Sequence, residues 1–410
     1  MLFIASMVTN ISNYAFQVVM ARLLTPVEYG LMNALLSLLA VMAVPVSTLL
    51  MVVTRKTSEF KARNDLAGIS GLYRLINTRV LVSGLIGFTV FILCAPSIRD
   101  YLHAPSLIPI VALGVLIFTT LAYPINMAVL QGVQDYKWMG INQGLGGPAK
   151  FLFAVLFVLT GFSVNGVMIG MIATSLLLWG VSYYPIRNFV MNRNQQAAII
   201  NRISFSEVLP IFLAVFAFAV LTQADIVLVR RYFTAHDAGI YASAAILGKA
   251  VMYIPGAIVL AMFPMVSEKY ALNQSSRHLL AKALAFTLLL SGLGTVLFYF
   301  FPGWIMDILY GTRYIEAHPV LKYYGIAMLP MGLLMVLMNY LIAREKSLFS
   351  CLMIIGAFLE ILAIFYFHSS LMHIVFIILA IGSLLFMGSI ALQYIPNFQR
   401  PTPVHEVHIK

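Results

Sequence analysis

The sequence predicts an all-α membrane protein of about twelve transmembrane helices, arranged as two six-helix bundles that a parallel repeat relates. Three observations support this fold class. Hydrophobic residues make up 61% of the chain and charged residues only 10%, with a mean hydropathy of +0.95, far above the roughly half-apolar composition of soluble domains. Apolar stretches long enough to cross a bilayer recur along the chain. A segment of the first half also returns in the second half.

The predicted spans are apolar stretches of about 17 to 28 residues, each able to cross a hydrocarbon core about 30 Å thick as a helix. They cover residues 2–21, 30–53, 80–96, 107–131, 145–161, 164–185, 208–229, 239–266, 283–302, 319–343, 350–367 and 374–395. The first span has no basic segment before it and no small-residue cleavage site, so we expect a retained helix and not a signal peptide. No connection is long enough for a folded catalytic domain.

The repeat aligns the segment from Arg22 to Glu59 with the segment from Arg231 to Glu268, without a gap. Most of the identities are polar residues or glycine that interrupt apolar runs: Arg22/Arg231, Thr25/Thr234, Gly30/Gly239, Leu38/Leu247, Ser58/Ser267 and Glu59/Glu268. An even number of spans separates the copies, so both have the same orientation. Transporters with such a parallel repeat bind their substrate between the two halves. We therefore expect bundles at 1–190 and 200–395 around a central cavity, then a cytoplasmic tail at 396–410.

Basic residues set the predicted orientation, because cytoplasmic loops retain Lys and Arg. When alternate connections are assigned to the cytoplasm, most Lys and Arg residues fall on that side. The other side holds Arg22, Arg99, Arg230, Arg231 and Arg313. Both termini should then face the cytoplasm, in the inner membrane of a prokaryote. The formal charge of +11 reflects this topology, and no soluble basic face exists for nucleic acid.

Polar side chains form a stripe on the first span. Ser6, Thr9, Asn10, Asn13 and Gln17 fall within an arc of roughly 100° on a helix. Unsatisfied polar groups are costly in hydrocarbon, so this face must meet protein, water or ligand. A helix that lines the cavity and a hydrogen-bonded seam between helices both fit the pattern. Prolines Pro45 and Pro255 lie at nearly matching places in the two copies and predict a kink in each.

Ionisable residues inside the spans are candidate functional groups. Lys249 lies deep in the eighth span, and Glu360 lies centrally in the eleventh. Each needs water, a partner or a ligand of opposite charge, and the two could pair with each other. Asp225 lies within the seventh span and is, with Glu360, a possible site for a coupling ion.

Arg22, Arg230 and Arg231 cluster at the outward ends of the first and seventh spans, against the positive-inside rule. Guanidinium groups bind phosphate oxygens bidentately. Their position therefore suggests an anionic ligand, and interfacial anchoring is the alternative interpretation.

Two segments carry a family resemblance. The string ARLLTPVEYGLMNALLSLL, which contains Arg22, and the segment from Ala224 to Glu268 are similar to signatures of the Wzx-type oligosaccharide flippases. These flippases belong to the multidrug/oligosaccharidyl-lipid/polysaccharide exporter superfamily. The likeness covers about 80 residues. This chain has Thr25 where glycine is common, and it has twelve predicted spans where some members have fourteen.

The resemblance implies a MATE-like fold and the transfer of polyprenyl-pyrophosphate-linked glycans from the cytoplasmic to the outer leaflet. By position, the cations that would meet the pyrophosphate are Arg22, Arg55, Arg231 and Lys249, with Asn13 and Gln17 lining the cavity. Alternating access between the bundles would move the glycan, with Asp225 or Glu360 free to bind H⁺ or Na⁺. The expected partners are the lipid-linked glycan, membrane lipids, and a glycan polymerase or export machinery.

Three alternatives stay open at this point. A MATE-type antiporter of cations or drugs should have an acidic and aromatic cavity, whereas this chain has as many cations as anions within its spans. A membrane enzyme such as a glycan polymerase or ligase needs a large outer loop or an acid and histidine motif, and neither is present in the sequence. A non-transporting subunit of a polysaccharide secretion complex would not need the cavity charges. We predict no catalytic residues, no cofactor and no metal site.

Overall fold

The computed structural model describes residues 2–191, 205–272, 274–344 and 347–393. Across these ranges the chain is α-helical and contains no strand. The helices of the first half are α1 (Leu2–Leu23), α2 (Pro26–Met42), α3 (Val44–Ala62), α4 (Leu66–Tyr101), α5 (Ile108–Thr119), α6 (Ala122–Gly132), α7 (Tyr136–Phe157) and α8 (Ser163–Met191). Those of the second half are α9 (Phe205–Tyr232), α10 (Ala235–Tyr253), α11 (Gly256–Ala271), α12 (Arg277–Phe300), α13 (Pro302–Leu309), α14 (His318–Ala343), α15 (Ser347–Tyr366) and α16 (Leu371–Leu392).

The described part of each predicted membrane span lies almost wholly on helix, which confirms the all-helical fold class. Within the described residues, ten helical stretches are long and apolar enough to cross a membrane. That number treats Tyr136–Arg187 as one stretch and leaves out α10 and α11. The chain turns back within the long stretch, at Gly161 with a φ of 91° and Ser163 with a φ of 50°. Helices α7 and α8 then pack against each other.

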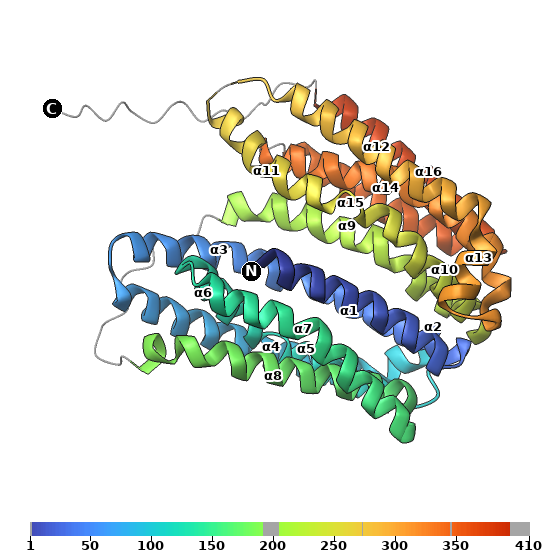
Figure 1. The fold of residues 1–410 in the computed structure, drawn as a ribbon, viewed down its shortest axis with the longest axis horizontal. Coiled ribbons are helices and arrows are strands. Elements are labelled where there is room, and N and C mark those ends of the chain that lie inside the picture. The colour runs from blue at the N-terminus through green and yellow to red at the C-terminus, as the bar shows by residue number, and fades with distance from the viewer. Residues whose placement is uncertain (1, 192–204, 273, 345–346, 394–410) are drawn as a thin grey trace.

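The two bundles meet along one seam (Figure 1). In the first half α7 packs between α1 and α8, and in the second half α14 contacts α10, α12 and α16. Helix α2 crosses to the second half and packs on α9 and α10. The expected boundary between 190 and 200 lies almost wholly outside the described residues, and the expected tail at 396–410 lies entirely outside them.

The repeat predicted from sequence is visible in the local structure. Thr25 caps α2 with φ −70° and ψ 158°, and its hydroxyl accepts a hydrogen bond from the backbone N–H of Glu28. Thr234 caps α10 with φ −62° and ψ 156° and accepts in the same way from Asp237. A threonine followed three residues later by an acid satisfies donors that the first turn of a helix leaves free. The two copies therefore begin with the same cap.

Both copies also break at the predicted prolines. Helix α2 ends at Met42 and α3 begins at Val44, with Pro45 in its first turn. Helix α10 ends at Tyr253, and Pro255 is the N-cap of α11. Proline removes a backbone donor and clashes with the preceding turn, so a continuous helix cannot pass through these positions without distortion. The kinks expected from the sequence are confirmed as breaks.

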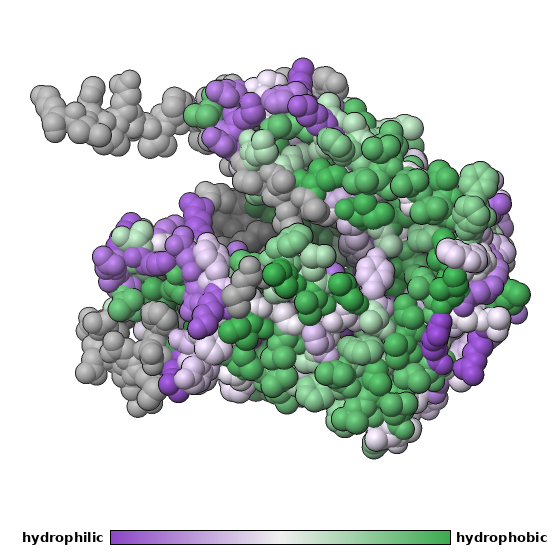
Figure 2. All heavy atoms as spheres, viewed as in Figure 1, coloured by the Kyte–Doolittle hydropathy of each residue, from purple (hydrophilic) through white to green (hydrophobic). Residues whose placement is uncertain are grey.

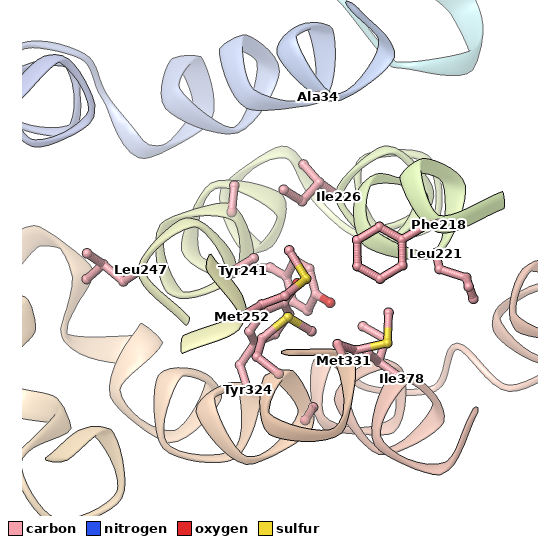
Figure 3. Packing of buried hydrophobic residues seen from close by; sticks show 14 of the residues in the cluster. Ala34, Phe218, Leu221, Ile226, Tyr241, Leu247, Met252, Tyr324, Met331 and Ile378 are labelled. Carbon is pink, nitrogen blue, oxygen red and sulfur yellow. The ribbon is translucent and has the colours of Figure 1, made fainter. Parts of the chain in front are cut away.

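The core of the second half lies between α9, α10, α14 and α16 (Figure 3). Met252 and Tyr241 of α10 face Tyr324 and Met331 of α14 there. The outward surface is apolar over a broad belt, whereas polar residues gather at the two ends of the helices (Figure 2). An apolar belt with polar ends is the surface that a bilayer requires.

The helix ends define two poles of the molecule. We name one the Arg22 end, where α1 and α9 finish and α2 and α10 begin, and the other the Lys61 end, where α3 finishes and α4 begins. Figure 2 shows the surface hollowed between the two halves toward the Lys61 end. At the Arg22 end the halves are in contact through several hydrogen bonds, which are described below.

Candidate functional site

A charged pair is enclosed within the second half. The Lys249 ammonium on α10 lies 3.4 Å from Oδ1 of Asp225 on α9, and the two side chains are only 3% and 1% exposed. A buried charge is stable only when it is paired and hydrogen-bonded. From the sequence, Lys249 has Glu360 as its candidate partner. The structure pairs it with Asp225 instead.

The Asp225 carboxylate is further satisfied by two tyrosines. The hydroxyl groups of Tyr241 and Tyr324 donate to its Oδ2 atom at 3.1 Å and 2.6 Å. These hydroxyls come from α10 and α14, which are two of the helices that form the core in Figure 3. Together with Lys249, the tyrosines replace the hydration that Asp225 would have in water. The position of Asp225 is therefore fixed from three directions.

Glu360 on α15 differs from Asp225 in its bonding. It is 1% exposed, and among the described residues neither carboxylate oxygen has a hydrogen-bond partner. It lies close enough to both Asp225 and Lys249 to interact electrostatically. A buried polar group without a partner costs about 1–3 kcal/mol, and a charged one costs more. Glu360 is therefore the acid of this cluster whose carboxylate is buried without a described hydrogen-bond partner, and its role as a coupling-ion site remains a prediction.

A polar bridge connects this cluster to the first half. The Gln223 side-chain oxygen on α9 accepts from the Lys249 ammonium at 3.5 Å and from the Ser37 hydroxyl at 3.0 Å. Ser37 belongs to α2, the helix of the first half that packs on α9 and α10. A shift of α2 along the seam would therefore change the Ser37–Gln223 contact, and through Gln223 it would change the surroundings of the Lys249 ammonium.

The other predicted cations do not gather around Lys249. Arg22 and Arg231 lie at the Arg22 end, where Arg22 contacts α13 and Arg231 lies over the ring of Tyr101 at 5.2 Å. Arg55 lies on α3, is 75% exposed, and forms an ion pair of 3.4 Å with Glu59. The structure thus distributes the four candidate cations over three places. Whether any of them contacts a substrate remains a prediction.

The polar stripe of α1 serves two purposes. Thr9 donates to the backbone oxygen of Gln143 on α7, which is a seam contact between helices. Gln17 accepts from the Tyr29 hydroxyl at 3.0 Å and donates to Asn33 at 3.4 Å. Asn13 is partly exposed on the same helix. Part of the stripe is therefore a hydrogen-bonded seam, and the prediction that Asn13 and Gln17 line a cavity stays a prediction.

Four members of the buried network were missed at the sequence level: Ser37, Gln223, Tyr241 and Tyr324. Each lies inside a predicted apolar span and carries a polar group, which is a detectable signal. Their convergence depends on how α2, α9, α10 and α14 pack, and no periodicity in the sequence reports that packing.

A comparison with family models decides the classification. A model described as "Polysaccharide biosynthesis protein" matches residues 19–319. The chain belongs to this polysaccharide biosynthesis family. The match includes both copies of the repeat, and it agrees with the resemblance to oligosaccharide flippases. A comparison with curated proteins found no match.

Solved structures show the fold of this polysaccharide biosynthesis protein. An inward-facing multidrug resistance MATE family transporter of the MOP superfamily is similar, with TM-score 0.75, 12% identity, and coverage of 94% of this chain and 95% of that chain. The lipid II flippase MurJ in an inward closed conformation gives TM-score 0.67 and 13% identity, with coverage of 95% and 87%. An outward-facing MATE transporter gives TM-score 0.64 and 12% identity, with coverage of 96% and 94%.

The fold is therefore MATE-like, and the chain is a multi-pass membrane protein, with ten helical stretches among its described residues that are long and apolar enough to cross a bilayer. The solved structures of this fold named above are MATE transporters and a lipid II flippase.

Proposed function

We propose that this protein moves a polyprenyl-pyrophosphate-linked oligosaccharide from the cytoplasmic to the outer leaflet by alternating access between its two halves. The observation that carries the proposal is the asymmetry of the seam. The surface is hollowed between the halves toward the Lys61 end, whereas Arg22, Arg230 and Tyr314 form hydrogen bonds between the halves at the Arg22 end. Such an asymmetry is expected of one state of an alternating-access cycle.

The distribution of charge supports the direction. Basic residues are concentrated at the Lys61 end, so the positive-inside rule assigns that end and both termini to the cytoplasm of a prokaryotic inner membrane. A glycan head group would then enter the hollow from the side on which it is made, and its polyprenyl tail would stay in the lipid. The family description and the likeness to a lipid II flippase support a lipid-linked glycan as the cargo.

The candidate residues then take separate roles. Arg55 at the entrance, and Arg22 and Arg231 at the exit, offset the charge of the pyrophosphate, while Asn13 and Gln17 line the route. Lys249 is enclosed with Asp225, so in this state it belongs to the control site and not to the path of the cargo. Gln223 contacts both Lys249 and Ser37, so it connects the charged cluster to the seam between the halves. A coupling site requires such a connection.

Asp225, Lys249 and Glu360 form that coupling site in our proposal. Binding of H⁺ or Na⁺ at Glu360 changes the net charge around Lys249, and Gln223 transmits the change to Ser37 on α2. An ion gradient adds to the membrane potential, which already favours outward movement of an anion by about 2.3 kcal/mol per charge per 100 mV.

Transfer can be measured in proteoliposomes that contain a fluorescent polyprenyl-pyrophosphate-linked saccharide and a membrane-impermeant quencher. Substitutions Lys249→Ala and Glu360→Gln should each slow transfer about tenfold, which corresponds to a loss of about 1.4 kcal/mol. Glu316→Gln is the control, because Glu316 is exposed and pairs with His236 within the second half. The model fails if neither variant nor their combination slows transfer while the protein is present and folded.

A second candidate, the antiport of organic cations, is favoured by the two buried acids Asp225 and Glu360 and by the MATE-like fold. The same vesicles loaded with a cationic dye separate the two candidates. Dye export without saccharide transfer would replace our proposal. Transfer of neither compound by folded protein would favour a non-transporting subunit of a polysaccharide secretion complex, or of the associated polymerase.

A further inference from the structure

At the Arg22 end, each half extends an arginine across the seam into the other half. Arg22 of α1 donates through Nε to the backbone oxygen of Leu309 at 2.9 Å and through Nη2 to that of Ile308. Arg230 of α9 donates through Nε to the backbone oxygen of Leu102 at 2.9 Å and through Nη2 to that of His103 at 3.3 Å. The two contacts run in opposite directions between the halves.

The acceptors on both sides are the carbonyl ends of helices. Ile308 and Leu309 are the last two residues of α13, while Leu102 and His103 directly follow the end of α4. The last carbonyl groups of a helix have no partner within it and carry the negative end of the helix dipole. A guanidinium group placed there makes two hydrogen bonds and a favourable charge interaction at once.

The reciprocity follows the internal repeat. Helices α1 and α9 are the first helices of their halves, and Arg22 aligns with Arg231, the neighbour of Arg230. Arg231 adds to the second contact, since its Nη1 lies 3.4 Å from Nε2 of His103. The repeat therefore places an arginine near the end of the first helix of each half, in contact with the end of α13 or of α4 in the other half.

Hydrogen bonds from guanidinium groups to backbone carbonyls suit a contact between the halves that must form and break in each transport cycle. The carbonyl acceptors are neutral, so separating the halves leaves no unpaired carboxylate behind, and the released guanidinium groups gain water. Arg230 is 2% exposed, whereas Arg22 lies at the surface. A buried donor that loses its acceptor has no water to replace it, so breaking its hydrogen bond costs more. We therefore expect the Arg230 contacts to contribute more to closure of the Arg22 end than the Arg22 contacts.

We propose that Arg22 and Arg230 form a reciprocal clasp that keeps the Arg22 end closed while the Lys61 end is open. Both sides of the clasp release before the Arg22 end opens. The clasp rests on the proposed movement of the two halves but not on the identity of the cargo. It can therefore be tested without any cargo.

The test measures the width of the Arg22 end by pulsed electron paramagnetic resonance in lipid nanodiscs. Spin labels are attached at Ser106→Cys, in the connection after α4, and at Thr312→Cys, after α13. Cys94 and Cys351 are exposed and are first replaced by alanine. We expect one short distance population in the parent and a shift of most molecules to longer distances in the R22Q/R230Q variant.

Arg99→Gln is the matched control, because Arg99 lies at the same end but pairs at 2.6 Å with Asp100 in its own half. It should keep the parental distance. The single variant R22Q affects a surface residue and should give a smaller shift in the same direction, so it decides the question if R22Q/R230Q does not fold.

Parental distances in folded R22Q/R230Q, or in R22Q when the double variant does not fold, would overturn the clasp, as would an equal shift in R99Q. If the distances shift as expected in R22Q/R230Q but the unsubstituted protein transfers no glycan, the clasp is supported and the cargo assignment is wrong. The two proposals can thus fail separately.

Discussion

Gly30 and Gly239, which occupy equivalent positions in the two copies of the repeat, lie against each other at the seam. A Cβ atom on Gly30 would be 2.7 Å from the backbone nitrogen of Gly239, and one on Gly239 would be 1.9 Å from the backbone oxygen of Pro26. Equivalent residues can meet in this way only close to the axis that relates the halves. Small residues allow two membrane helices to approach at backbone distance, and here they bring α2 and α10 together.

Gly239→Ala should lower the free energy of unfolding, because the added methyl group has no space against the backbone of α2. Overpacking of this kind costs about 1–3 kcal/mol, so the Tm in detergent should fall. Gly292→Ala on α12 is the control, since a Cβ there meets no atom within 4 Å. An unchanged Tm for Gly239→Ala would mean that α2 and α10 are not in backbone contact at this position.

Lys249→Met should destabilise the second half, because it leaves the buried carboxylate of Asp225 without its cation. Removing one partner of a buried ion pair costs about 3–5 kcal/mol. The combination Lys249→Met with Asp225→Asn should recover part of that loss, since the unpaired charge is then gone. Thermal unfolding of both single variants and the double variant measures the coupling.

Lys56→Met provides the comparison for the buried pair. Lys56 pairs with Glu59 at 2.7 Å, but both side chains reach solvent. Exposed pairs contribute about 0–1 kcal/mol, so this variant should unfold close to the parental temperature. Equal losses at Lys56 and Lys249 would show that burial does not govern the strength of these pairs.

Thr25→Ala and Thr234→Ala should have similar effects, because the two threonines cap equivalent helices. Loss of such a cap costs about 1 kcal/mol, and serine at either position should retain most of the stability because its hydroxyl can accept the same hydrogen bond. Calorimetry of the four variants tests the equivalence. A loss at only one of the two positions would argue against a shared role in the repeat.

Thiol labelling of intact cells tests the orientation. In a background without Cys94 and Cys351, Asn64→Cys at the Lys61 end should be protected from a membrane-impermeant reagent, whereas Thr312→Cys at the Arg22 end should react. Both positions are exposed, so a difference in labelling reports the side of the membrane. The reverse pattern would invert the proposed direction of transfer.

The fold was largely predictable from composition and repeat, because apolar span length and the matching caps at Thr25 and Thr234 are local properties. The breaks near Pro45 and Pro255 were predictable for the same reason. The pairing of Lys249 was not, since it depends on the relative rotation of α9 and α10 and on tyrosines from α10 and α14. Likewise, the sequence indicated an unusual cluster at Arg22, Arg230 and Arg231, but their carbonyl acceptors lie on segments far away in the chain.

The pairing of Asp225 with Lys249 has a consequence for ion stoichiometry. Lys249 is a cation that is covalently part of α10, so it cannot exchange with the bath or leave with a transported molecule. In this arrangement the charge of Asp225 is balanced by a cation of the protein itself, so under the proposed coupling an experiment that counts ions moved per cycle should assign the exchangeable charge to Glu360.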